Sequence, residues 1–195
     1  MSLRLELAEL GLPALDALDV DALAVFVGPE RPLQGLAGYA DWRLCGALSR
    51  AIRAGHFGGG YGEALLIPSA GRLEVERVFC FGVGEAPLDA ASYAQALLQA
   101  CEAMQKAQSE AFATSLPPCA TEGELAIPSA RLWIEACVRF RGRRQVLLGD
   151  SRALGRDLGV AKQALGADID VFLPTARVQM PARPMSLPPS GHVVR

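Results

Sequence analysis

The chain has 195 residues, enough for one domain with a full hydrophobic core and too few for most two-domain enzymes. Hydrophobic residues make up 51% of it and aromatic residues only 6%, so the core must be built mainly from Ala, Leu and Val. Because 19 basic residues stand against 21 acidic ones, the formal charge is −2, and we expect no general attraction to nucleic acid.

The N-terminal part of the chain predicts two strands and one helix. The alternation L-R-L-E-L over residues 3–7 predicts a half-buried strand at a sheet edge, followed by a Leu- and Asp-rich connection. The continuous apolar run DALAVFVG, residues 21–28, predicts a central strand that is covered on both faces. Apolar residues at spacings of three and four over 36–54 predict one amphipathic helix, which Gly55 ends.

The middle of the chain predicts a pair of strands and the longest helix. After the glycine-rich loop GHFGGGYGE, the apolar runs 64–68 and 77–84 predict two buried strands joined by a turn at 69–71. Asp89 can cap a helix that begins near Ala90. The buried stripe of this helix is predicted to contain Tyr93, Leu97, Cys101 and Met104.

Two further strand and helix pairs follow. Residues 111–116 predict a short strand, and a proline suits the first turn of a helix from 128 to about 141. QVLLG, residues 145–149, predicts another strand, and Asp150 or Ser151 can cap the helix after it.

Strongly apolar strands that alternate with helices indicate a three-layer α/β fold, a mixed, mostly parallel sheet of about six strands with helices on both faces. This domain is predicted to span residues 1–173. From Pro174 onward the chain holds five prolines and few large apolar residues. Residues 174–195 are therefore predicted to form an extended or disordered Pro-rich tail.

The sequence predicts a cytoplasmic protein with no membrane partner. Its start, MSLRLELAEL, lacks the uninterrupted apolar core of a signal peptide, and no apolar run approaches 18 residues. No C-x-x-C pair occurs, so we expect no metal and no cofactor. The cysteines are interpreted as reduced, small apolar residues: Cys45, Cys80, Cys101, Cys119 and Cys137.

Gly58, Gly59 and Gly60 are a candidate for a phosphate loop, because such a run can turn backbone N–H groups toward an anion. This run, however, leads from a helix C-terminus into a strand, where the helix dipole has the wrong sign. No lysine lies nearby and no P-loop pattern fits. We interpret the segment as a helix stop and a flexible connection.

The turn after QVLLG is better placed for a ligand, because open α/β sheets bind ligands at the carboxyl ends of their strands. The candidate ligand-binding residues are Gly149, Asp150 and Ser151 in this turn, together with Gly28 after the central strand. Asp150 puts a negative charge where a phosphate would lie, and an Asp-Ser pair is also typical of a plain helix cap. The plain cap is the favoured interpretation.

Catalytic and nucleic-acid-binding features are scarce. His56 and His192 are the only histidines, and neither G-x-S-x-G nor H-E-x-x-H occurs, so no catalytic residue is assigned. One basic cluster is interpreted as a solvated helix end, where cations are stabilised by the dipole. It consists of Arg139, Arg141, Arg143 and Arg144.

Three stretches resemble the N-terminal domain of leucyl aminopeptidases over residues 21–118. They are DALAVFVG, GALSRAIRAGHFGGGYGEALLIPSAGRLEVERVFCFGVGE, and the helix after PLDAASYAQAL. The resemblance implies a macro-like fold, which the order of strands and helices lets us extend to about Leu173. It also implies a non-catalytic domain that helps to assemble the oligomer. Peptidase activity is not expected, because the family's N-T-D-A-E-G-R signature needs an asparagine and this chain has none.

The same fold includes macro domains that bind or hydrolyse ADP-ribose. Typical members have an Asn-rich sequence and a run of glycines after the second strand, whereas this chain reads VGPERPLQGLAGYAD, with Glu30 where an anion would be unwelcome. Our first hypothesis is therefore a non-enzymatic macro-like domain that acts through protein contacts, by self-association or by binding a partner, with the tail as one possible docking segment. The alternative is a module that binds a nucleotide or ADP-ribose in the strand-end crevice. A third hypothesis is an enzyme of unrecognised chemistry.

Overall fold

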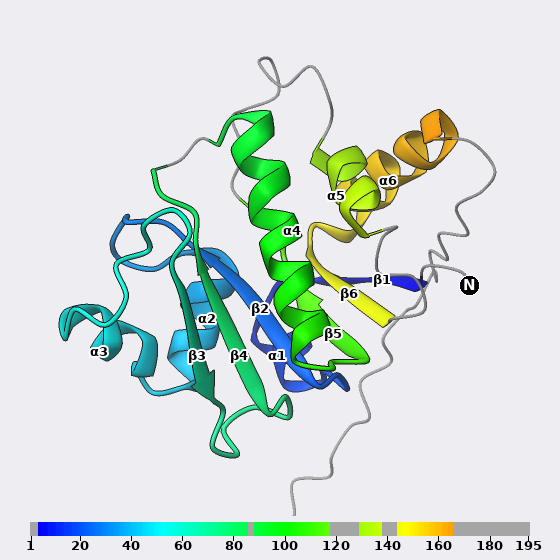
Figure 1. The fold of residues 1–195 in the computed structure, drawn as a ribbon. Helices are drawn as coiled ribbons and strands as arrows, with labels where there is room; N and C mark the ends of the chain where they lie inside the picture. Colours follow the sequence, from blue (N-terminus) through cyan, green and yellow to red (C-terminus); the bar gives the residue numbers. More distant parts are fainter. Residues whose placement is uncertain (1–3, 86–87, 118–128, 138–143, 166–195) are drawn as a thin grey trace, which may run out of the picture.

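The computed structural model describes residues 4–85, 88–117, 129–137 and 144–165 (Figure 1). Its strands form one sheet in the order β1-β6-β5-β2-β4-β3. Neighbours run parallel except β3 and β4, which form an antiparallel pair. The strands are β1 (Arg4–Glu9), β2 (Ala22–Val27), β3 (Ala64–Pro68), β4 (Arg77–Gly82), β5 (Ala111–Thr114) and β6 (Arg144–Gly149).

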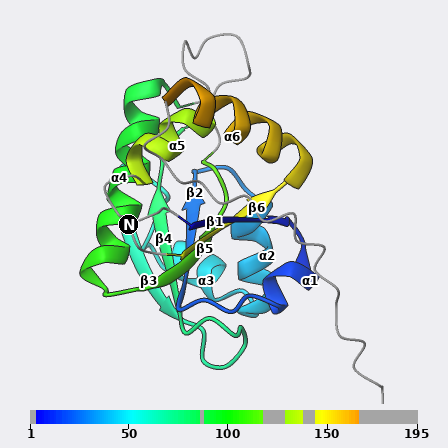
Figure 2. The same cartoon turned by 90° about the vertical axis from the view of Figure 1, so that its right-hand side faces the viewer.

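Helices cover both faces of this sheet, as Figure 2 shows from the side of β1. One core lies under α4, α5 and α6, and the other under α1, α2 and α3. The helices are α1 (Leu12–Asp16), α2 (Gly35–Arg43), α3 (Ala47–Arg53), α4 (Ala90–Lys106), α5 (Ser129–Cys137) and α6 (Ser151–Leu165). The predicted three-layer α/β fold with a mixed, mostly parallel sheet is confirmed.

β2 is the central strand that the sequence predicts. All six of its residues are buried, and it pairs with β5 on one side and β4 on the other. Leu23, Val25 and Val27 enter one core, while Ala22, Ala24 and Phe26 enter the other. A strand covered on both faces has no reason to alternate polar and apolar residues, which explains its continuous apolar sequence.

α4 also forms as predicted. Asp89 caps it by accepting a hydrogen bond from the N–H of Ser92 at 2.7 Å. The predicted stripe is buried: Tyr93, Leu97, Cys101 and Met104. Edge position is likewise confirmed for β1, which ends the sheet beside β6.

The prediction of a single helix over 36–54 is wrong. The backbone adopts positive φ at Cys45 (φ 53) and Gly46 (φ 78), and this break separates α2 from α3. Leu44 and Leu48 are both buried, so apolar residues keep helical spacing across the break although the backbone there is not helical. Cys45, one of the cysteines interpreted as reduced and small apolar residues, is a free cysteine that lies exposed at the break.

Two other expectations need correction. β3 is an edge strand that alternates exposed and half-buried residues, with Leu66 52% exposed, so it is not buried like β4. The Leu- and Asp-rich connection after β1 contains the short helix α1, with Pro13 in its first turn and Leu15 buried. Five residues are too few for helical periodicity to be visible in a sequence.

Several predictions fall on residues outside the described ranges. They concern the tail 174–195, the apolar stretch 170–173, Pro128, and the arginines at 139, 141 and 143. Within the described ranges, none of the helices combines the length and the apolar character needed to cross a membrane.

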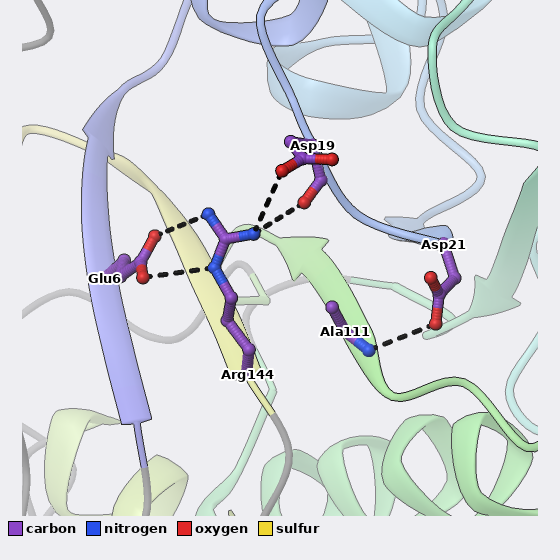
Figure 3. A network of polar contacts seen from close by, with 5 residues as sticks. All are labelled: Glu6, Asp19, Asp21, Ala111 and Arg144. Carbon is purple, nitrogen blue, oxygen red and sulfur yellow. Dashed lines mark hydrogen bonds and ion pairs between the residues drawn. The ribbon is translucent and has the colours of Figure 1, made fainter.

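Arg144 does not belong to a helix end. It begins β6 and joins three segments of the chain (Figure 3). Its Nε and Nη2 donate to the two carboxylate oxygens of Glu6 on β1, at 3.0 and 2.8 Å, and its Nη1 donates to the carbonyl of Asp19 at 2.6 Å. Beside it, Asp21 accepts the N–H of Ala111 at 3.1 Å, which fixes the start of β5 against β2.

We predict that Arg144→Ala lowers the free energy of unfolding by about 1–3 kcal/mol, because a half-buried, bidentate, charge-assisted pair is lost. Urea denaturation measures the change. The matched control is Arg131→Ala, whose partner Glu135 lies one turn along α5 and whose side chain is 40% exposed. This control should change stability by no more than about 0.5 kcal/mol. Equal losses in the two variants would contradict the prediction.

We also predict that Gly46→Ala destabilises the domain by about 1–2 kcal/mol, because a Cβ is unfavourable at left-handed φ. Contact is not the cause, since the nearest atom to a Cβ there would be Arg50 Nη1 at 3.5 Å. Gly159→Ala in α6, where a Cβ meets nothing within 4 Å, should instead stabilise the domain by about 1 kcal/mol. In urea denaturation we expect Gly46→Ala to lower the midpoint and Gly159→Ala to raise it.

Candidate functional site

A crevice of about 620 Å³ opens where the parallel strands β2, β5 and β6 reach their carboxyl ends. Phe26 and Val27 at the end of β2, Leu116 after β5 and Leu148 at the end of β6 give it an apolar floor. The first turns of α2 and α6 form its sides. We call this hollow the carboxyl-edge crevice.

Three of the four predicted ligand-binding residues line this crevice. Gly28, Gly149 and Asp150 come together there although they are far apart in sequence. Ser151 does not join them, because it lies in a neighbouring hollow against β1. Its hydroxyl and its backbone N–H both donate to the carboxylate of Glu9, the N–H at 3.2 Å.

The N-terminus of α6 is already bonded to carboxylates of the chain. Asp150 Oδ1 accepts the N–H groups of Arg152 and Ala153, at 3.0 and 2.9 Å. The bond from Ala153 is the main reason why the pKa of Asp150 is lowered, with a further contribution from Arg152. Together with the bond from Ser151 to Glu9, these contacts engage the N–H groups that a bound phosphate would use. The predicted helix cap at Asp150 is confirmed.

The glycine-rich loop holds an anion as well, and that anion is Glu63. Gly58, Gly59 and Gly60 all donate their N–H groups to Glu63 Oε2, at 2.7, 3.0 and 3.2 Å. The bond from Gly58 is the largest cause of the lowered pKa of Glu63. Successive N–H groups that converge on one oxygen form an anion-binding concavity.

This loop crosses the carboxyl ends of β2 and β4 at close range. A Cβ on Gly59 would come within 2.5 Å of the carbonyl oxygen of Gly28, and one on Gly82 within 2.0 Å of that of Gly60. The guanidinium of Arg31 ties the two segments together by donating to the carbonyls of Gly28 and Gly58 at 2.8 and 3.1 Å. Gly55 ends α3 as expected, with φ 74, but the loop is held by these bonds and is not a loose connection.

The charged side chains that line the crevice are all acidic: Glu30, Asp150 and Asp157. Arg152 and Arg156 lower the pKa of Asp150 but do not line the crevice. An anionic ligand would therefore meet fixed negative charge at three points of the wall.

Chemistry-bearing residues do not gather in the described part of the chain. No group of three His, Cys, Asp or Glu residues there could hold a metal ion. His56 is exposed beside the glycine-rich loop, and His192 lies outside the described ranges. Burial raises the pKa of Cys80 to about 12, so this thiol stays protonated.

The carboxylates that occupy the backbone donors of the glycine loop and of α6, Glu63 and Glu9, were not predicted from the sequence. The role of Glu63 could have been predicted, because Glu63 follows the glycine triplet by three residues and its carboxylate can fold back over such a short distance. The role of Glu9 could not have been predicted, since 142 positions separate it from Ser151.

Comparison with known proteins assigns the chain to a family. The model for the cytosol aminopeptidase family, N-terminal domain, matches residues 24–139. No curated protein sequence matches the chain significantly.

Among solved structures, a tomato leucine aminopeptidase mutant superposes with a TM-score of 0.56 and 19% identity. The match covers 82% of this chain but only 35% of that enzyme. The macrodomain of Mycobacterium tuberculosis DarG superposes with a TM-score of 0.55 and 14% identity, and the match covers 76% of this chain and 99% of that one. An Oceanobacillus iheyensis macrodomain mutant with ADPR superposes with a TM-score of 0.58 and 11% identity. This match covers 83% of this chain and 92% of that one.

At these identities the structural matches show the fold alone, whereas the family model covers more than half of the chain. The resemblance noted in the sequence is therefore confirmed, together with the macro-like fold that it implies. The chain belongs to the cytosol aminopeptidase family, through its N-terminal domain.

Proposed function

We propose that this domain is a non-catalytic macro-like module that acts through protein contacts, by self-association or by binding a partner chain. The observation that carries the proposal is the occupation of its anion-binding donors. The N–H groups of the glycine loop and of the α6 N-terminus are bonded to Glu63, Asp150 and Glu9 of the chain itself.

A phosphate ligand would have to displace these carboxylates and then lie next to them. Displacement loses several charge-assisted hydrogen bonds to backbone N–H groups. The displaced carboxylates would add to the repulsion from Glu30 and Asp157. Juxtaposed like charges cost several kcal/mol at an interface.

No peptidase activity is proposed for this domain. The matched family model describes the N-terminal domain, and the chain spans about a third of the tomato enzyme, 35% of its length. The N-T-D-A-E-G-R signature is absent from the sequence.

The second candidate function is binding of a nucleotide or ADP-ribose in the carboxyl-edge crevice. Its support is the position of the crevice, which brings Gly28, Gly149 and Asp150 to the edge where open α/β sheets bind ligands. The volume of about 620 Å³ lies within the range of small-molecule sites. The similar fold of a macrodomain solved with ADPR adds to it.

Thermal denaturation with ADP-ribose separates the two functions. A ligand at a hundred times its dissociation constant would stabilise the domain by about 2.7 kcal/mol, which raises the melting temperature by several degrees. We expect no shift with the wild-type chain at millimolar ADP-ribose. The variant Glu63→Ala, Asp150→Ala frees the N–H groups of the glycine loop and those of Arg152 and Ala153, and we expect it to acquire a measurable shift.

The control is the double variant Glu102→Ala, Glu135→Ala, which removes two exposed carboxylates that do not line the crevice and should stay unresponsive. A shift in the wild-type chain would contradict the proposal and favour the second candidate. A chain that is monomeric in light scattering and that purifies with no other protein from its native extract would contradict the protein-contact role.

We predict that the cap at α6 makes stability depend on acid pH. Because the pKa of Asp150 is lowered on folding, its ionised form stabilises the domain. That contribution is complete above the pKa of the unfolded chain and disappears as the pH falls through the lower folded value. Asp150→Asn cannot titrate, so between about pH 5 and pH 2 it should lose less stability than the wild type.

Urea midpoints measured across that interval test the prediction. Asp157→Asn is the matched control, because its carboxylate lies on the same helix but caps no backbone N–H of the described residues. This control should follow the wild-type curve. Parallel curves for the wild type and Asp150→Asn would show that the cap does not control the acid response.

A further inference from the structure

The outer edge of β1 carries backbone groups that face away from the sheet. β1 ends the sheet, and among the described residues only β6 pairs with it. The N–H of Leu10, directly after β1, donates to the carbonyl of Gly149 at 3.1 Å. Because alternate residues of a strand direct their N–H and C=O groups to opposite edges, Leu7 and Glu9 direct theirs away from β6.

These two positions form the accessible part of the edge, on the side from which Figure 2 views the molecule. Leu5 has the same orientation but is fully buried, whereas Leu7 is half-buried and Glu9 is exposed. A strand edge with open N–H and C=O groups is a template for pairing with another extended segment.

A hollow of about 540 Å³, the one that Ser151 lines, runs along this edge. We call it the β1-edge hollow. Its lining includes side chains from both faces of β1: Ala8 packs against the core under α1, α2 and α3, and Leu7 against the core under α4, α5 and α6. A hollow that reaches both faces of an edge strand lies along the open edge of that strand. It therefore has the position that a further strand would take.

The short helix α1 gives the hollow an apolar wall. Pro13, Ala14, Ala17 and Leu18 contribute to this wall. Three of these side chains are small, which leaves room for the side chains of an added strand. When an extended peptide adds to a sheet edge, its main-chain hydrogen bonds provide affinity, and contacts with alternate side chains provide specificity.

Carboxylates outnumber cations in the lining of the β1-edge hollow. Arg144 is the one basic residue that lines it, and two carboxylates share its charge (Figure 3). Glu6 accepts two hydrogen bonds from it, and the fully exposed carboxylate of Asp19 lies 3.9 Å from its Nη1. Glu9 bonds the neutral Ser151, and no cation pairs with it among the described residues. The charge of the hollow thus complements a basic segment.

We infer that the β1 edge binds an extended, basic segment of a partner protein as a further strand of the sheet. The inference rests on the proposed protein-contact function and names its surface and the chemistry of its partner. The N–H and C=O groups of Leu7 and Glu9 bond the main chain of the segment, α1 contacts its apolar side chains, and its Lys or Arg side chains face the carboxylates of Glu9 and Asp19.

The charge favours a basic segment over a second copy of the chain. Pairing of two β1 edges would add the carboxylates of the second copy to those already at the edge, whereas Lys or Arg side chains would neutralise them. Like charges brought together at an interface oppose association.

A synthetic peptide, acetyl-Lys-Val-Lys-Val-Lys-Val-amide, tests strand addition to the full chain by isothermal titration calorimetry. Two N-methylated forms each lack one alternate set of backbone N–H groups. The form that lacks the set facing β1 should bind about tenfold more weakly or worse, because its hydrogen bonds to the edge are lost. The other form should bind like the parent peptide. Equal losses in the two forms contradict strand addition.

Amide hydrogen exchange locates the bound peptide. The N–H groups of Leu7 and Glu9 should exchange rapidly in the free chain and about tenfold more slowly when the peptide saturates it. Two amides serve as controls and should not change. They are the N–H of Leu10, which already bonds Gly149, and that of Leu66 in β3, the strand at the opposite edge of the sheet.

Charge substitution tests the preference for a basic segment. Asp19→Lys should weaken binding of the peptide by about threefold, because an exposed carboxylate at the hollow becomes a cation. The fold should be retained, since Arg144 also bonds the backbone carbonyl of Asp19. The matched control is Glu102→Lys, on α4 and outside the lining of the hollow, which should bind the peptide like the wild type. A peptide with Glu in place of each Lys should bind more weakly than the parent.

A parent peptide that fails to bind at millimolar concentration overturns the inference. So does protection of Leu7 and Glu9 in the free chain. If deletion of residues 166–195 removes that protection, the occupant is the chain's own C-terminal segment, and if dilution removes it, the occupant is a second copy. Each of these results leaves the proposed protein-contact function standing. Wild-type binding of ADP-ribose, by contrast, counts against the proposed function whatever the peptide does.

Discussion

The burial of β2 on both faces is the constraint on which the rest of the domain depends. No residue of this strand has a solvent-facing side, so a helical layer must lie on each side of the sheet. β4 and β5 flank it in parallel, and β6 continues the sheet in the same direction. Parallel strands end at the same edge, and their ends create the crevice between α2 and α6. The position of the candidate site is thus a consequence of core packing.

What the crevice can bind is decided by carboxylates. The macro-like fold directs backbone N–H groups of the glycine loop and of α6 toward this edge, which is the usual arrangement for an anion. Here Glu63, Asp150 and Glu9 accept those hydrogen bonds. Asp150, together with Glu30 and Asp157, also gives the crevice an acidic lining. A shared fold therefore coexists with a strand-end edge whose backbone donors are occupied and whose lining is acidic.

Elements with strong periodicity could be predicted from the sequence, and those set by distant contacts could not. The continuous apolar run of β2 and the stripe and cap of α4 were evident because each is a local pattern. The break at Cys45 and Gly46 was hidden, because buried Leu44 and Leu48 keep helical spacing across it. Arg144 resembled a member of a basic helix end until Glu6, 138 positions away, proved to be its partner. Of the four residues predicted to bind a ligand, Gly28, Gly149 and Asp150 line the crevice, whereas Ser151 lines the neighbouring hollow.

The sequence by itself determined the α/β class, the central strand, the family and the lack of an asparagine for the peptidase signature, since all of these follow from local order and composition. Only the tertiary structure decided that the backbone donors are occupied and that the crevice at the strand ends has an acidic lining. The reason is physical: a hydrogen bond or a charge pattern depends on distances between side chains, and folding brings together groups such as Glu9 and Ser151 that the sequence keeps far apart.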